Sequence, residues 1–221
     1  MVSARVARRV VKTIVFVAAT TPLTLLVLQG IEGTLGANPI ETLTHGTGIW
    51  ALRLLLVTLA ISPFRRLSGW HSIMSLRRML GLLAFLHATL HFGTYLVLDQ
   101  FFDLGSIAED VVRRPYLTVG FGAFTLLVPL AVTSTKEMIR RLGGKWWRLL
   151  HRLIYVGAVS AVFHYLWLVK ADARSPLVYG TILAVLLGYR VWHVLYTAPK
   201  RMPKSVRQKN QVPATGAEAG T

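Results

Sequence analysis

Long apolar segments recur along this 221-residue chain and constrain its fold more than any other feature. A helix needs about 20 predominantly apolar residues to cross the hydrocarbon core of a bilayer. The chain contains several such runs, and its mean hydropathy of +0.52 lies well above the balance of a soluble domain. The sequence therefore predicts an all-α integral membrane protein.

We expect a bundle of six transmembrane helices within residues 13–196. The expected spans are 13–28, 48–61, 80–98, 116–134, 146–170 and 177–196. The second is the shortest, beginning a few residues before 48, and Ser62-Pro63 is expected to end it. Residues 1–12 form a basic N-terminal segment, and the polar tail 197–221 is expected to be disordered.

The basic residues indicate the orientation of this bundle. Of the 25 lysines and arginines, 18 lie in the N-terminal segment, the loops 62–79 and 134–148, and the tail, whereas the alternate loops hold most acids. The positive-inside rule then places both termini in the cytoplasm. The net charge of +16 reports this topology. We expect contact with anionic lipid but no nucleic-acid partner, because no soluble basic face exists.

The N-terminal run also has the pattern of a signal peptide, but it is as long as a span and lacks a cleavage site directly after it, so we expect it to be retained.

Histidines inside the apolar spans are the candidate functional residues. The chain has no cysteine, so histidine is its only strong nitrogen or sulfur ligand for a metal. At 1.5 Å per residue from the basic flanks, His91 lies about 20 Å and His164 about 24 Å deep. Two imidazoles at similar depth could bind one haem iron from opposite faces. His87 lies about 6 Å shallower than His91 and matches His164 less well.

His151 lies only about 5 Å from the cytoplasmic flank. It is 13 residues from His164, so the two side chains point about 140° apart on a straight helix, which suits separate cofactors or a local bend. The spacing alone leaves open that each histidine only hydrogen-bonds a neighbouring helix. His45 and His71 are expected in loops and His193 near the end of the last span, each solvated or facing lipid.

Other side chains complete the expected site. Arg53, Arg152 and Arg190 are expected to extend towards the membrane surface, with pairing to haem propionates as the alternative. Aromatic residues near the histidines are expected to pack around a macrocycle: Phe85, Phe92, Tyr95, Tyr155, Phe163, Tyr165 and Trp167.

Several segments resemble one known family in their amino-acid sequences and in their order along the chain. They are LGANPIE, ISP at 61–63, RRMLGLLAFLHATLHFGTYLVLD, RRPYLTVGFGAFTLL, PLAVTSTKEMIRRLGGKWWRLLHRLIYV and HYLWLVK, and together they cover nearly all of residues 30–170. These segments are similar to the MsrQ (YedZ) family, which belongs to the ferric-reductase-like transmembrane domains. The histidines of that family match His91, His151 and His164.

The resemblance implies an electron conduit in the bacterial inner membrane. It implies electron flow from the quinone pool through b-type haem, with FMN also assigned to the family, to MsrP, a periplasmic molybdenum enzyme that reduces methionine sulfoxide in oxidised proteins. The chain itself offers no nucleophile paired with a base, so the sulfoxide chemistry is expected in that partner, which we expect to dock on the acidic outer loop 99–115.

The sequence does not decide how electrons enter on the cytoplasmic side of the membrane. His151 is a candidate for a second haem or for electron acceptance on the cytoplasmic side, but Arg77 and Arg78 stand where ferric reductases place a fourth histidine. Two alternatives also remain, a stand-alone transmembrane ferric reductase and a non-redox membrane scaffold.

Overall fold

The computed structural model describes residues 4–169 and 172–197, and this part of the chain contains helices and no strand. The predicted all-α class is confirmed. The tail after residue 197 lies outside the described residues. The elements in order are α1 (Ala4–Ile31), α2 (Pro39–Ser68), the 3-10 turn η1 (His71–Ile73), α3 (Met74–Thr94), the π-helical turn η2 (Tyr95–Asp99), α4 (Leu104–Arg113), α5 (Pro115–Val132), α6 (Lys136–Leu150), α7 (Leu153–Leu168) and α8 (Arg174–Thr197).

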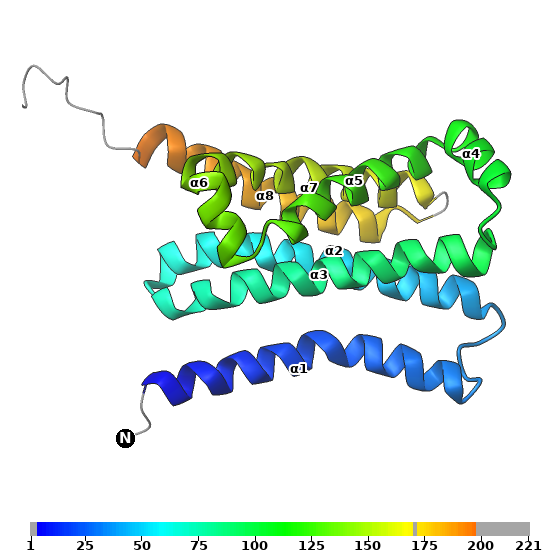
Figure 1. The fold of residues 1–221 in the computed structure, drawn as a ribbon, viewed down its shortest axis with the longest axis horizontal. Helices are drawn as coiled ribbons and strands as arrows, with labels where there is room; N and C mark the ends of the chain where they lie inside the picture. The colour runs from blue at the N-terminus through cyan, green and yellow to red at the C-terminus, as the bar shows by residue number, and fades with distance from the viewer. Residues whose placement is uncertain (1–3, 170–171, 198–221) are drawn as a thin grey trace, which may run out of the picture.

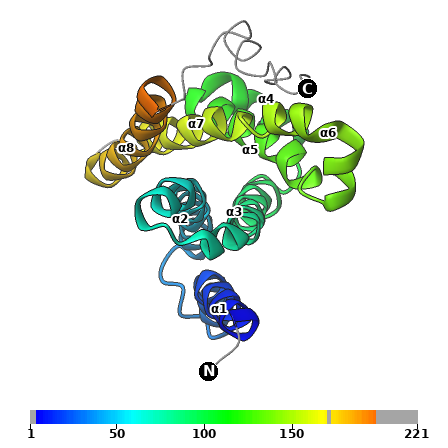
Figure 2. The same ribbon diagram turned by 90° about the vertical axis from the view of Figure 1, so that its left-hand side faces the viewer.

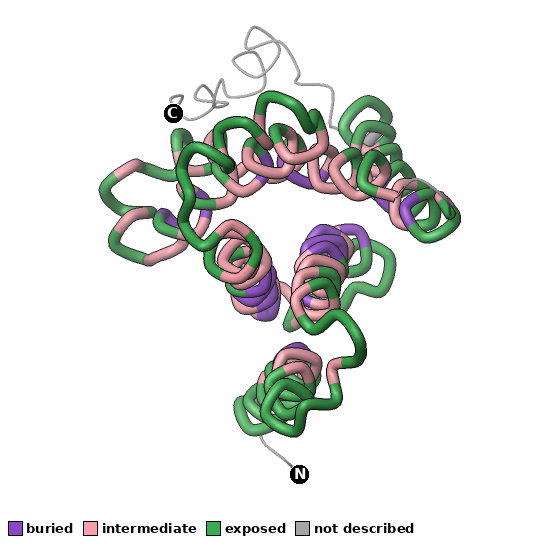
Figure 3. Tube along the Cα trace, turned by 90° about the vertical axis from the view of Figure 1, so that its right-hand side faces the viewer, coloured by how far each residue is buried: buried purple, intermediate pink, exposed green. Residues whose placement is uncertain are grey.

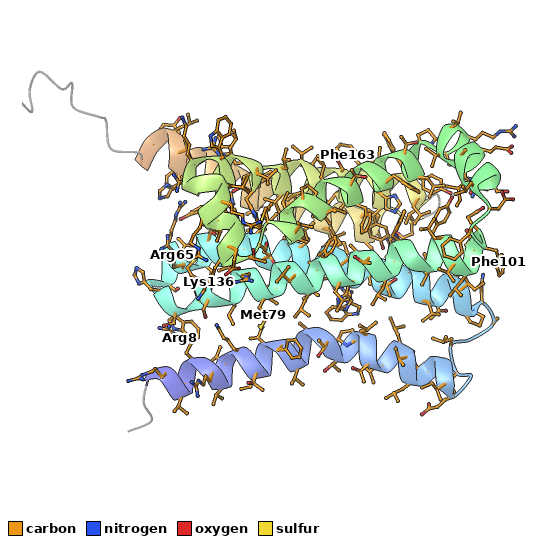
Figure 4. All side chains as sticks on the ribbon, in the orientation of Figure 1. Arg8, Arg65, Met79, Phe101, Lys136 and Phe163 are labelled. Carbon is orange, nitrogen blue, oxygen red and sulfur yellow. The ribbon has the colours of Figure 1, made fainter. Side chains whose placement is uncertain are left out.

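Five stretches of the described chain are long and apolar enough to cross a membrane, and α6 with α7 makes a sixth if the bent pair counts as one span. The long helices lie side by side, with the start of α1 and the end of α8 at the same end of the bundle (Figure 1). The labelled basic residues Arg8, Arg65 and Lys136 lie at this end, and Phe101 lies at the opposite end (Figure 4). We call these two ends the basic end and the α4 end.

The helices form three layers. α1 lies on one side, α2 and α3 form the middle, and α5 to α8 cover the other side (Figure 2). Buried residues gather in the middle layer, whereas α1 is largely exposed (Figure 3). Leu55 and Leu59 of α2 and Leu80 and Leu83 of α3 belong to one apolar core with Ala158 of α7. The middle layer therefore positions the rest of the bundle.

The second span is longer than predicted, because α2 continues through Pro63 to Ser68. Proline has no N–H, so the carbonyl of Leu59 loses its usual donor within the helix. Nη2 of Arg190 on α8 donates to this carbonyl at 2.7 Å, and Nη1 donates to the hydroxyl of Tyr155 on α7. The expectation that Arg190 extends to the surface is wrong, since its guanidinium joins three helices.

Residues 146–170 do not form one straight span. α6 ends at Leu150, α7 begins at Leu153, and the two are bent by 44°. The Trp147 indole Nε1–H donates to the Thr133 carbonyl at 2.9 Å, which holds α6 against the end of α5. Because α7 must then run along α5, the chain changes direction at His151 and Arg152.

The helix starts also differ from expectation. α1 begins at Ala4, so the described part of the basic segment 1–12 belongs to that helix. α2 begins at Pro39, where the Asn38 side chain accepts from the backbone N–H of Glu41 at 3.3 Å, an ordinary N-cap followed by proline at N1. The loop expected over 29–47 is therefore short, and His45 lies in a helix.

Candidate functional site

His91 and His164 lie side by side in the half of the bundle near the α4 end. His91 is near the end of α3 and His164 near the end of α7. Their ring centres are 6.0 Å apart and the ring planes meet at 75°. Both line a mainly apolar cavity of about 270 Å³ between α2, α3, α5 and α7. The two histidines of matched depth are thus brought together.

Each of these imidazoles is held by a backbone carbonyl of the neighbouring helix. Nδ1 of His91 lies 2.8 Å from the oxygen of Thr44, and Nδ1 of His164 lies 2.7 Å from the oxygen of Tyr116. A carbonyl oxygen only accepts, so Nδ1 carries the proton in both rings and Nε2 keeps its lone pair. Metal-binding histidines are commonly oriented in this way.

Two glycines make room for the rings. A Cβ added to Gly48 would lie 2.9 Å from Nδ1 of His91, and one added to Gly120 would lie 2.7 Å from Nδ1 of His164. Each glycine follows the accepting residue, Thr44 or Tyr116, by four positions. The same arrangement of carbonyl and glycine therefore occurs once on α2 and once on α5.

The cavity walls are aromatic and aliphatic. Phe92 stacks on Phe124 with ring centres 4.7 Å apart and meets Phe121 edge-on at 4.9 Å. Of the expected walls, Phe92, Tyr95 and Tyr165 line the cavity. Phe163 and Trp167 are exposed, and Phe163 points away from the bundle (Figure 4). Phe85 stacks on Phe124, and Tyr155 binds Arg190 instead.

Polar residues line the cavity towards the α4 end. They are Tyr95, Asp99, Arg114 and Tyr116. Asp110 of α4 accepts from the Gln100 side chain at 3.0 Å and from the Tyr95 hydroxyl at 3.4 Å, and it pairs with Nε of Arg114 at 3.1 Å. These contacts join α4 to the cavity lining.

His45 is a cavity residue that the sequence did not single out. It was expected in a loop, but it lies in α2, directly after Thr44, and lines the cavity. Its ring meets Tyr165 edge-on at 6.1 Å. The Asn38-Pro39 helix start was the signal that could have placed it.

His87 and His151 lie outside this cavity lining. His87 is fully buried, and its Nδ1 bonds the Leu83 carbonyl of its own helix at 2.9 Å. His151 stacks on Trp147 at 4.0 Å, and its Nε2 lies 3.2 Å from the Thr133 hydroxyl. That hydroxyl donates its proton to the Pro129 carbonyl, so it accepts from His151. In this arrangement Nε2 of His151 carries a proton, unlike Nε2 of His91 and His164.

The His91–His164 pair fits a haem. No group of three histidine or acidic side chains suited to a metal ion occurs in the described part of the chain. A haem needs only the two axial ligands, because its macrocycle supplies the others. With metal–imidazole bonds of about 2.0 Å on each side, two axial ring centres lie roughly 6 Å apart. The observed 6.0 Å matches this spacing.

Comparison with known proteins agrees with this geometry. Residues 47–162 match the family described as "Ferric reductase like transmembrane component". The fold and the facing histidines thus define a ferric-reductase-like transmembrane protein.

Three similar proteins are each named "Protein-methionine-sulfoxide reductase heme-binding subunit MsrQ". The first, from Herminiimonas arsenicoxydans, is 53% identical over 82% of this chain and 84% of its own. The second, from Azospira oryzae, is 50% identical over 83% of each chain. The third, from Rhodospirillum rubrum, is 52% identical over 80% of this chain and 85% of its own. The chain belongs to the MsrQ family.

Proposed function

We propose that this chain is the haem-binding, electron-transferring subunit of a protein-methionine-sulfoxide reductase system. His91 and His164 would hold one b-type haem. The observation that carries this proposal is the facing pair of imidazoles, each with Nδ1–H bound to a carbonyl and Nε2 free. The MsrQ relatives, named as heme-binding subunits, support the same assignment.

The protein residues perform three tasks at this site. A bound haem supplies one-electron chemistry at its iron. The carbonyls of Thr44 and Tyr116 fix the imidazole orientation and increase the basicity of Nε2. Gly48 and Gly120 allow the close approach that this needs, and the aromatic and aliphatic walls exclude water, which favours a defined reduction potential.

We propose the quinone pool as the electron donor and a periplasmic molybdenum enzyme of the MsrP type as the acceptor, with FMN as a further cofactor. These assignments rest on the family resemblance. The resemblance also implies that methionine sulfoxide is reduced in the partner. We place the protein in the bacterial inner membrane with the basic end and both termini in the cytoplasm, since Arg8, Arg65 and Lys136 lie at one end (Figure 4).

His151 is proposed to serve the cytoplasmic half of the path, as a ligand of a second haem or in electron acceptance. Binding a second iron through Nε2 requires release of the Thr133 hydroxyl. A potentiometric titration of the wild type and His151→Ala separates the two roles. A second haem gives two components in the wild type and one in the variant, whereas a single component in both excludes it.

The haem assignment is tested by the visible spectrum of the purified full-length protein after expression with ample haem. A Soret band and reduced b-type bands are expected. If these bands are absent, a non-redox membrane scaffold is the better assignment.

The partner assignment is tested in proteoliposomes with quinol and either an MsrP-type protein or a ferric chelate. Fast iron reduction without transfer to the protein acceptor favours a stand-alone ferric reductase.

A further inference from the structure

Phe101 and Phe102 are two adjacent exposed aromatic residues at the α4 end. Phe101 is 78% exposed and Phe102 is 61% exposed. Their φ angles are +49° and +60°, in the left-handed region. Bulky residues rarely adopt this conformation, and it persists only where the surroundings enforce it.

The surroundings of the turn do enforce it. The backbone N–H of Phe102 donates to the Leu96 carbonyl at 2.9 Å, and that of Asp103 donates to the Gln100 carbonyl at 2.8 Å. The Asp103 carboxylate then caps α4 by accepting from Gly105 and Ser106. The turn is held from both sides while its two phenyl groups remain exposed. Together with Leu104, also 78% exposed, they form an apolar surface that we call the Phe101 patch.

The Phe101 patch lies next to the candidate haem cavity. Tyr95 and Asp99, the first and last residues of η2, line that cavity, and Phe101 follows Asp99 by two residues. Figure 4 shows Phe101 at the α4 end of the bundle. A soluble protein seated on the patch is therefore close to the polar end of the cavity.

The charges around the patch do not suit a lipid surface. Helices that lie on anionic membranes carry lysine and arginine on their polar face. Here the polar residues include Asp99, Asp103, Glu109 and Asp110. The two arginines of this segment pair with two of these acids, Arg113 with Glu109 at 3.0 Å and Arg114 with Asp110 at 3.1 Å, so the net negative charge comes from Asp99 and Asp103. An apolar patch with an acidic surround is complementary to a protein that offers an apolar recess with a basic rim.

We propose that the Phe101 patch is the docking site for the soluble electron-accepting subunit, with Phe101 and Phe102 as its apolar anchors. This inference rests on the proposed function. It requires the partner to present an apolar recess bordered by lysine or arginine near its redox cofactor. Exposed aromatic side chains at the centre of an interface commonly carry much of the binding energy.

The test is a stopped-flow measurement on full-length, haem-loaded protein in nanodiscs, reduced and then mixed with the MsrP-type subunit. The double variant Phe101→Asn/Phe102→Asn removes both phenyl groups but tolerates the left-handed turn. We expect its second-order rate of haem reoxidation by the partner to fall about tenfold or more. Its absorption spectrum and its reoxidation by ferricyanide stay unchanged.

Val112→Asn is the matched control, because Val112 on α4 is 83% exposed but lies outside the patch. It should leave the partner rate within about twofold. An unchanged partner rate in the phenylalanine variant, or an equal loss with ferricyanide, overturns the docking site. The chain has six native tryptophans, so the fluorescence added by Phe101→Trp is measured as the difference from wild type. Strong quenching of this added fluorescence by brominated lipid, unaffected by the partner, assigns the patch to the membrane instead. If the wild type itself transfers no electrons to the partner, the proposed function fails with it.

Discussion

At the scale of single residues, the imidazole positions predict which histidines bind iron. His91→Ala and His164→Ala should each abolish the b-type absorption bands of the haem at this site, because the facing Nε2 would lose its counterpart. His87→Ala should retain the bands, because the His87 side chain lies outside the cavity lining. Reduced-minus-oxidised spectra measure this. Loss of the bands only in His87→Ala reassigns the ligand on α3.

The glycines beside the rings make a second prediction at this scale. Gly48→Ala and Gly120→Ala place a Cβ within 3.0 Å of Nδ1 of His91 and His164, so each ring must rotate or its helix must move away. We expect haem content to fall severalfold, with altered bands in the remainder. Gly122→Ala is the control, because nothing lies within 4 Å of its added Cβ. Equal haem content in all three variants contradicts a spacing role for Gly48 and Gly120.

The sequence predicts which residues lie together where this depends only on their depth along a helix. The rise per residue was enough to bring His91 and His164 together. It could not find Gly48 or Gly120, because their role depends on which face of α2 and α5 meets the neighbouring helix. It also left His45 in a loop, since the short polar stretch before α2 masked the Asn38 cap.

At the scale of elements, the contact between Arg190 and the proline-broken turn of α2 can be tested by a double-mutant cycle. Arg190→Gln should lower thermal stability, because it leaves the buried carbonyl of Leu59 without a donor. Pro63→Ala restores an N–H for that carbonyl, so Arg190→Gln should cost less in the Pro63→Ala background. The expected coupling is about 1 kcal/mol. Intrinsic tryptophan fluorescence during heating provides the stabilities, and additive losses exclude the coupling.

The cap of α4 gives a prediction about pH. Hydrogen bonds from the Ser106 side chain and from the Ser106 and Gly105 backbones hold the pKa of Asp103 below its usual range. A lowered folded-state pKa means that the carboxylate stabilises α4 above its ordinary pKa, and that this stabilisation is lost as the pH falls through the folded value. Hydrogen exchange of an α4 peptide should be slower in the wild type than in Asp103→Ala near neutral pH. The difference should vanish in strong acid, and a difference independent of pH contradicts this role.

Elements were predictable where a long apolar run stands alone, as in α5 and α8. Pro63 was read as a helix end because a proline removes a backbone donor, but Arg190 satisfies the freed carbonyl from a distant part of the sequence. The bend at His151 depends on the Trp147–Thr133 contact, which no local pattern reveals. The helix α4 was not predicted from the sequence, although Leu104, Ile107, Ala108, Val111 and Val112 have helical spacing. Its segment is too short to cross a membrane and was therefore expected to be part of the loop 99–115.

At the scale of the whole molecule, the site lies between two closely packed helix pairs. α2 with α3 supplies His91 and its carbonyl, and α5 with α7 supplies His164 and its carbonyl. Buried Gly157 and Ala158 on α7 and Ala123 on α5 allow the second pair to approach closely. Across the cavity, the two pairs also meet through aromatic side chains, such as Phe92 of α3 with Phe121 and Phe124 of α5. A haem held by His91 and His164 would add a coordinate link between the two pairs of helices.

Removal of haem should accordingly loosen the molecule between these pairs rather than within them. A ligand that binds only the folded state stabilises it by about 2.7 kcal/mol at a free concentration one hundred times its Kd. We expect haem-loaded protein to unfold at a Tm several degrees above that of the haem-free protein in the same detergent. Hydrogen exchange should increase most at the cavity faces of α3 and α7 when haem is absent. The control is His91→Ala, whose Tm should not respond to added haem. An equal rise in Tm in this variant means that the stabilisation does not pass through the His91–His164 pair.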